Sequence, residues 1–138
     1  MMRKIFFAAT FVLSSLLLMS GCTTLQPPTQ EEMSSANYGE LPGNYEEQIK
    51  NAMSASLKDP YTAHYRFLKP FKGYTQDGEW SPSKGSVAYG WIVPVYVNAK
   101  NSYGGYVGER RYVYIFSGGV LYDTTTNDMF NRVQPLNQ

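Results

Sequence analysis

Cysteine and histidine are nearly absent from this sequence of 138 residues, which contains one of each, Cys22 and His64. A single cysteine excludes an internal disulfide, so the fold must be stabilised by packing alone. A single histidine with no cysteine or acidic cluster beside it makes neither a metal site nor a nucleophile-activating pair. We therefore expect no metal site, no catalytic residue and no enzymatic activity, and we interpret His64 as a structural or solvent-facing residue.

Charge is also sparse and balanced, since charged residues make up 17% of the chain and the formal net charge is +1. Such a balance creates no field that would attract nucleic acid, so we expect no nucleic-acid partner. The acidic residues Asp77, Glu79 and Glu109 lie apart in the sequence, without an evident pairing partner. The pair Glu46-Glu47 fits the start of a helix better than a catalytic pair of carboxylates.

The long apolar run of the sequence lies at its N-terminus, over residues 5–19, directly after the basic residues Arg3 and Lys4. This run is shorter than the roughly 20 apolar residues that a helix needs to span a bilayer. A basic start, a short apolar middle and an exit of small residues are typical of a cleaved export signal. We therefore predict that residues 1–21 form a signal peptide that is removed.

The end of this segment, Met19-Ser20-Gly21-Cys22, resembles the lipobox of bacterial lipoproteins, with Met19 where the family usually has an aliphatic residue. The resemblance implies cleavage between Gly21 and Cys22, a diacylglycerol thioether on Cys22, and acylation of the new amino terminus. Several acyl chains hold a protein at a bilayer, because each buried CH₂ contributes about 0.8 kcal/mol. This covalent lipid is the only cofactor we expect. The alternative is an ordinary secretory signal followed by a free thiol.

The residue after the cysteine bears on the choice of membrane. By the same resemblance, an aspartate at this position would favour retention in the inner membrane, and the sequence has Thr23 instead. We therefore expect the protein to be anchored by lipid in the outer membrane of the cell, with its domain facing the periplasm.

Removal of the signal leaves a chain that is long enough for one compact domain. Residues 22–40 are polar and contain Pro27-Pro28, and such a composition does not offset the entropy of ordering, so we predict a lipidated, flexible tether there. Residues 41–138 are predicted to form a single globular α+β domain. All twelve tyrosines and both tryptophans follow the signal, so aromatic rings should supply much of the packing.

One helix is predicted, over residues 44–58. Asn44 is a suitable N-cap, and Asp59-Pro60 ends the helix because the residue before a proline is pushed out of the helical region. Apolar residues recur at helical spacing and make one face, which we expect in the core. These residues are Tyr45, Ile49, Ala52, Met53 and Leu57.

The chain after the helix predicts strands. Alternating patterns mark four of them, over residues 63–68, 87–99, 110–116 and 120–122. Gly118-Gly119 predicts a hairpin between the last two, residues 70–85 predict a long loop, and Pro94 predicts a bulge or an edge position. A helical turn is predicted over residues 128–132.

The predicted fold class is therefore α+β, with one N-terminal helix packed on an antiparallel meander of three to four strands. One face of the sheet should meet the helix. The other face should be exposed to solvent and carry several tyrosines.

Three short patterns support a family resemblance. Lys58-Asp59-Pro60 is followed by Tyr65-Arg66-Phe67, and residues 90–108 have the sequence GWIVPVYVNAKNSYGGYVG. These patterns, KDP, YRF and GW.V.V.VNAKN.YGGY.G, resemble a group of small uncharacterised proteobacterial lipoproteins. The resemblance covers roughly residues 57–120 and implies a shared fold and a location in the cell envelope, but no reaction. The chain departs from the group at Pro94, where we expect a residue with a backbone N–H, often cysteine.

Residues 98–108 connect two predicted strands and have two interpretations. In the first they are a structured hairpin loop, in which glycines supply positive φ and amide side chains bond the backbone. In the second they are a recognition loop that displays aromatic faces beside Lys100 and Arg110. The candidate interaction residues are Asn98, Asn101, Tyr103, Gly104, Gly105 and Tyr106.

Two functions follow from these observations. The leading hypothesis is an envelope lipoprotein with a non-catalytic domain that binds another component of the envelope, most simply a protein. The alternative is a carbohydrate-binding or peptidoglycan-binding module, in which Trp91, Tyr103 and Tyr106 stack on sugar rings.

Overall fold

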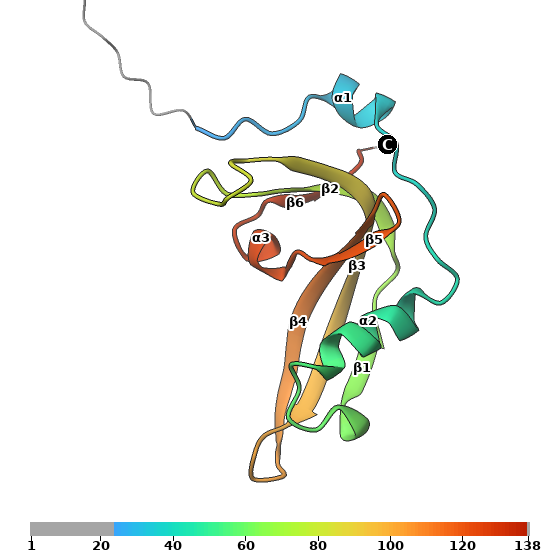
Figure 1. Ribbon diagram of the computed structural model, residues 1–138, viewed down its shortest axis with the longest axis vertical. Helices are drawn as coiled ribbons and strands as arrows, with labels where there is room; N and C mark the ends of the chain where they lie inside the picture. The colour runs from blue at the N-terminus through green and yellow to red at the C-terminus, as the bar shows by residue number, and fades with distance from the viewer. Residues whose placement is uncertain (1–23, 138) are drawn as a thin grey trace, which may run out of the picture.

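The computed structural model describes residues 24–137, so the predicted signal peptide, Gly21 and Cys22 lie outside the described residues. The described chain forms one antiparallel sheet with short helices around it (Figure 1). The helices are α1 (Gln30–Ser35), α2 (Tyr45–Ser54), the 3₁₀ helix η1 (Pro60–Thr62) and α3 (Thr125–Met129). The strands are β1 (His64–Phe67), β2 (Phe71–Gln76), β3 (Val87–Lys100), β4 (Tyr106–Ser117), β5 (Val120–Asp123) and β6 (Val133–Pro135).

The predicted antiparallel sheet is confirmed, and the fold is broadly α+β or mainly β. The sheet has six strands where three to four were predicted, and several short helices accompany it where one was predicted. Its order is β5-β4-β3-β2-β6, and β1 pairs with the other end of β3. The registers of β1 and β2 on β3 differ by one residue, because His64 faces Asn98 whereas Phe71 faces Ile92. The two are therefore nearly one continuous strand with a step at residues 68–70. Among the described helices, none is long and apolar enough to cross a membrane.

This step explains how Pro94 is accommodated in the central strand. The carbonyl of Pro94 accepts a hydrogen bond from the Leu68 N–H at 3.0 Å. The N and O of a strand residue point to the same side, so the missing N–H of Pro94 faces the step, where β1 ends and β2 has not begun. The predicted edge position is wrong, since β3 lies between β4 and the β1–β2 strand.

One face of the sheet packs against α2. The buried side chains Ile49 and Met53 of α2 contact buried residues of β3 and β4: Val93, Val95, Val97, Tyr114 and Phe116. This confirms the predicted apolar helix face for Tyr45, Ile49 and Met53, but Ala52 is exposed. The helix ends at Ser54, so Leu57 reaches the core from the turn that follows it. Asn44 makes no capping bond with its side chain, which instead accepts from the Gln48 amide at 2.8 Å.

The opposite face of the sheet is not exposed to solvent at its centre, so that prediction is wrong. Ile92, Val113 and Ile115 are fully buried there and form a second cluster with Val133 and the half-buried Phe71. The physical reason is that β3 is apolar at both alternating sets of positions, so both of its faces need cover. Tyr65, Tyr112 and Tyr114 of the sheet lie on the other side, in the cluster that includes α2.

The predicted loop at residues 70–85 is also wrong in its first half, which is strand β2. Gly73 was the signal for a loop, but it is a strand glycine that faces Gly90 directly across the β2–β3 pair. A Cβ on Gly73 would overlap the Gln134 carbonyl oxygen, and one on Gly90 would overlap that of Phe116. Both glycines therefore allow a close approach of backbones, not a turn. The helical turn predicted at residues 128–132 is α3, which begins three residues earlier and ends at Met129. Strand β6 follows at residue 133.

The flexible tether predicted at residues 22–40 does not describe residues 26–40, which lie on the domain. Helix α1 begins with a capping box between Thr29 and Glu32. Met33 and Tyr38 are only 5% and 8% exposed, and the Tyr38 hydroxyl donates to the Met33 carbonyl at 2.6 Å. The Tyr38 ring packs edge-on against Tyr89 of β3, with centroids 5.9 Å apart. The segment is polar on average, so its composition did not predict that these two large side chains would be buried.

We predict that Gly90→Ala destabilises the fold strongly. The added Cβ would overlap a backbone carbonyl that cannot move without disturbing β4, so the free energy of unfolding should fall by about 2–3 kcal/mol. Urea unfolding of the purified protein measures this. Gly43→Ala is the matched control, because its Cβ meets nothing within 4 Å. Equal unfolding midpoints for the two variants would contradict the prediction.

Candidate interaction surfaces

The hairpin that joins β3 and β4 is held by its own amide side chains. Oδ1 of Asn101 accepts from the N–H groups of Tyr103 and Gly105, at 2.9 and 3.1 Å. Oδ1 of Asn98 accepts from the Gly108 N–H at 3.0 Å. Gly104 and Gly108 have positive φ, and a register shift between Asn98 and Lys100 lies just before the turn. These contacts support the structural interpretation of residues 98–108 for both asparagines.

Tyr106 is engaged with the neighbouring elements. Its hydroxyl donates to the Thr62 carbonyl of η1 at 2.9 Å, and its ring stacks on His64 with centroids 4.8 Å apart. The Lys100 ammonium lies 5.4 Å from the centroid of the same ring. Because its ring and hydroxyl already have partners, Tyr106 holds the hairpin against β1 and η1. His64 is exposed, and its contact in this region is the stacked Tyr106 ring.

Tyr103 is different, because its side chain is 98% exposed at the tip of the hairpin. Tyr61 of η1 is 97% exposed at the same end of the molecule, where Tyr106 joins η1 to the hairpin. A hollow of about 200 Å³ lies beside the hairpin on the α2 side of the sheet. Three cationic residues line it together with apolar ones, namely Lys58, Lys100 and Arg110. We call Tyr61, Tyr103 and these three cations the hairpin surface.

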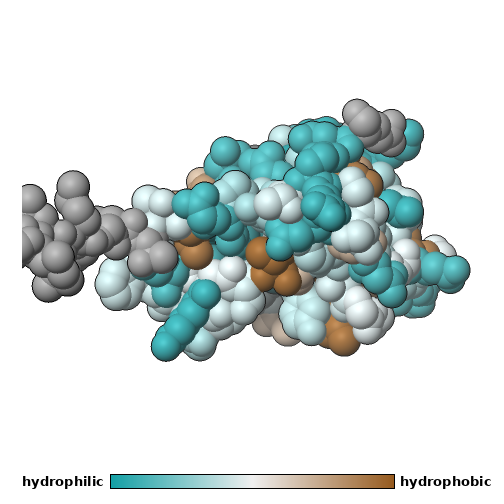
Figure 2. Space-filling view, turned by 90° about the horizontal axis from the view of Figure 1, so that it is seen from above, coloured by the Kyte–Doolittle hydropathy of each residue, from teal (hydrophilic) through white to brown (hydrophobic). Residues whose placement is uncertain are grey.

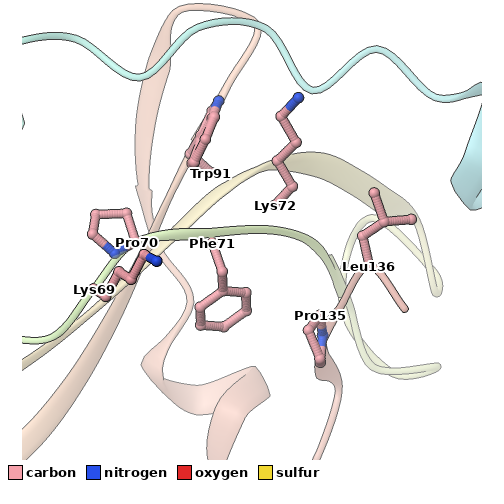
Figure 3. A pocket seen from close by; sticks show the side chains of 7 residues that line it. All are labelled: Lys69, Pro70, Phe71, Lys72, Trp91, Pro135 and Leu136. Atoms are coloured by element: carbon pink, nitrogen blue, oxygen red, sulfur yellow. The ribbon is translucent and has the colours of Figure 1, made fainter. Parts of the chain in front are cut away.

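Trp91 lies at the other half of β3. Its indole N–H donates to the Gly39 carbonyl at 3.1 Å, and the Lys72 ammonium is 5.4 Å from its ring. It lines a hollow of about 480 Å³ at the open end of β2 (Figure 3), together with Lys69, Pro70, Phe71, Lys72, Pro135 and Leu136. Nine strand residues separate Trp91 from Lys100, a length of about 30 Å. The structure therefore does not bring Trp91 together with Tyr103 and Tyr106.

The charged side chains on the sheet face opposite α2 are paired with one another. Arg66 binds Glu109 in a bidentate ion pair, with distances of 3.0 and 2.7 Å, and its guanidinium lies over the Tyr96 ring. The hydrogen bonds from Arg66 hold the pKa of Glu109 below its usual value. Arg111 makes a second pair with Asp128 of α3 at 2.9 Å. Glu109 therefore has a partner that the sequence did not reveal.

A polar network joins the β2–β3 loop to α3. The Asn127 amide donates to the Thr75 hydroxyl at 2.9 Å and to the Asp77 carboxylate at 3.0 Å, while Ser83 also donates to Asp77. The Arg132 guanidinium donates to the Asn127 carbonyl oxygen at 3.0 Å. Hydrogen bonds from Ser83 and Asn127 lower the pKa of Asp77. No signal in the sequence links residues that lie about fifty positions apart, so this network could not be predicted.

Two adjoining hollows, of about 400 and 260 Å³, lie on either side of this network. Trp80 lines the larger one and is 96% exposed. Over residues 24–137, no three His, Cys, Asp or Glu side chains are grouped so that they could hold a metal ion.

No protein-family model, curated protein or solved structure matches this chain.

We predict that Asn101→Ala loosens the hairpin without unfolding the domain. Two hydrogen bonds of about 1 kcal/mol each are lost, so amide hydrogen exchange at Tyr103 and Gly105 should become at least about tenfold faster. Asn101→Asp is the control, because it keeps the accepting oxygen. Unchanged exchange in the alanine variant would show that the amide does not hold the turn.

We also predict a pH-dependent effect of Asp77→Asn. A carboxylate whose pKa is lowered by folding contributes stability above its unfolded pKa of about 3.9, and this contribution is lost as the pH falls through the folded pKa. The variant should therefore be less stable than the wild type at neutral pH, by about 1 kcal/mol, and the gap should close in acid. Thermal unfolding over a pH series measures the gap.

The control for this experiment is Glu79→Gln, which removes a charge from an exposed residue of the same loop. It should unfold at the wild-type temperature throughout the series. A gap between Asp77→Asn and the wild type that stays constant with pH would contradict the prediction.

Proposed function

We propose that this protein is a lipoprotein of the bacterial outer membrane, anchored through lipid on Cys22, whose domain binds another protein of the cell envelope and catalyses no reaction. The lipobox-like residues 19–22 support the anchor. The observation that carries the binding role is the placement of the hairpin surface at the far end of the molecule from the described start of the chain (Figure 1).

The long strand β3 sets this separation. Its first residues adjoin Gly85, which contacts the Leu25 side chain near the start of the described chain. Its last residues lead into the hairpin that carries Tyr103. Fourteen strand residues span about 45 Å, so a domain held by Cys22 would present its hairpin well away from the membrane surface.

The composition of the hairpin surface indicates the chemistry of the partner. Exposed tyrosine and arginine side chains are frequent at the centres of protein interfaces, because they bury large area at low entropic cost and donate hydrogen bonds. Lys58, Lys100 and Arg110 make the surface cationic. We infer a partner with acidic side chains around a pocket that accepts the Tyr103 ring.

Peptidoglycan is the second candidate, and the free ring of Tyr103 is the observation that favours it. An exposed aromatic ring stacks on sugars as well as on protein, and a cationic rim suits the carboxylates of peptide stems. Trp91 contributes nothing to this site, because it lies about 30 Å away along β3.

The first test concerns the anchor. The mature protein, extracted from membranes, should have the mass of residues 22–138 plus that of the acyl groups, and it should fractionate with outer membranes. Cys22→Ser should lose the added mass and the membrane association. A mature wild-type protein without added mass would contradict the proposed anchor.

The second test places a photo-crosslinking amino acid at Tyr103 in living cells. We expect one defined protein adduct from Tyr103, and none from the control position Tyr122, which is also exposed but lies on β5. Titration with soluble muropeptides separates the two candidates. Suppose that muropeptides give binding heat, that this heat disappears in Tyr103→Ala, and that no protein adduct forms. Peptidoglycan would then be the partner of the hairpin surface, and the proposed protein partner would be wrong.

A further inference from the structure

The second tryptophan, Trp80, projects from the loop between β2 and β3 into solvent. Its side chain is 96% exposed, whereas Trp91 is half-buried and donates a hydrogen bond. An exposed indole is costly in water, but its apolar ring and polar N–H suit the boundary between membrane and water, where tryptophan is enriched. The binding role proposed for the hairpin surface does not explain why this tryptophan is exposed.

The start of the described chain lies against this same loop. The Leu25 side chain touches Gly85, and the Gln26 carbonyl accepts from the Gln76 amide at 2.9 Å. That amide also donates to the Gly85 carbonyl, at 3.3 Å. Four peptide units separate Cys22 from Gln26, so their Cα atoms are at most about 15 Å apart, whatever path the chain takes. A lipid on Cys22 would thus hold the β2–β3 loop close to the bilayer.

The loop that carries Trp80 is fixed before any contact is made. The Gly78 carbonyl accepts from the N–H groups of Ser81 and Gly85, at 3.1 and 3.2 Å. Asp77 ties the base of the loop to Asn127 of α3 through the polar network. Because little ordering would accompany binding, the exposed indole can enter an interface at low entropic cost.

Two further exposed apolar side chains lie near the loop that carries Trp80. Met129 and Phe130 lie at the end of α3 and are both exposed. Arg132 connects them to the loop, since its guanidinium lies over the Phe130 ring and beside Gly78. Lys84 adds an exposed cation on the loop itself. Figure 2 views the molecule from the α1 end and shows separate apolar patches on a mainly hydrophilic surface, which is suited to shallow contact.

We propose that the β2–β3 loop seats Trp80 in the headgroup region of the same bilayer that holds the Cys22 lipid, with Met129 and Phe130 beside it. This contact fixes the orientation of the domain and directs the β3–β4 hairpin away from the membrane. The proposal rests on the lipid anchor of the proposed function. The proposed partner of Trp80 is a phospholipid surface. The competing outcome of the test is that Trp80 binds a protein.

The test uses the acylated, full mature protein in vesicles of phosphatidylethanolamine and phosphatidylglycerol, with and without phosphatidylcholine brominated in its acyl chains. Bromine quenches tryptophan only within the bilayer. Wild-type emission should be quenched, and Trp80→Phe should remove at least about half of that quenching, because an indole at the interface lies within reach of the chains. Trp91→Phe is the matched control and should retain the quenching.

Intact mass, measured on the same sample, separates the two proposals. Acylated protein whose quenching is the same in the wild type and in Trp80→Phe overturns the membrane contact and leaves the anchor standing. Protein without added mass overturns both. A photo-crosslinker at position 80 that captures a protein and no lipid also overturns the contact. If Trp91→Phe fails to fold, the comparison of wild type with Trp80→Phe decides the question alone, since Trp80 is 96% exposed and its replacement should not disturb the fold.

Discussion

The double-sided burial of β3 is the constraint on which the rest of the structure depends. Its alternating residues are apolar in both sets, so α2 covers one face, and the other face carries a second apolar cluster that includes Val133 of β6. Helix α3 contacts β4 and β2. The close approach of Gly90 to the Phe116 carbonyl draws β4 against β3 at the centre. Once the middle of β3 is fixed in this way, its two ends project from the core in opposite directions, and both proposed contact regions lie at those ends.

The features that the sequence predicted are those set by neighbouring residues. The apolar face of α2, the position of β3 and the Gly118-Gly119 hairpin all follow from local periodicity or local turn chemistry, and the structure confirms them. The hairpin at residues 98–108 was also found, because its glycines and asparagines are adjacent in sequence. The sequence could not show which tyrosine of the hairpin has no fixed contacts. Tyr106 contacts Thr62 of η1 and His64 of β1, and both residues are distant from it in the sequence.

The features that were missed depend on distant partners. Strand β2 contains a glycine that marks a loop by composition, and only its partner Gly90 and the chain at Gln134 show why a glycine is needed there. Met33 and Tyr38 are buried although they lie in a polar segment, and the Tyr38 ring packs against Tyr89 of the sheet. The two tryptophans could not be told apart from the sequence for the same reason. Trp91 donates to the Gly39 carbonyl, whereas Trp80 is 96% exposed.

The docking of residues 26–40 changes what an anchor at Cys22 would do. A long flexible tether would let the domain sample all orientations and distances, and the effective concentration of its binding surface at any one height would be low. Because three residues lie between Cys22 and Gln26, a lipid on Cys22 would restrict the domain to a narrow layer beside the bilayer. The length of β3 would then determine how far the hairpin reaches. In such an arrangement the distance between the membrane and the hairpin would depend on the length of β3 more than on the length of a linker.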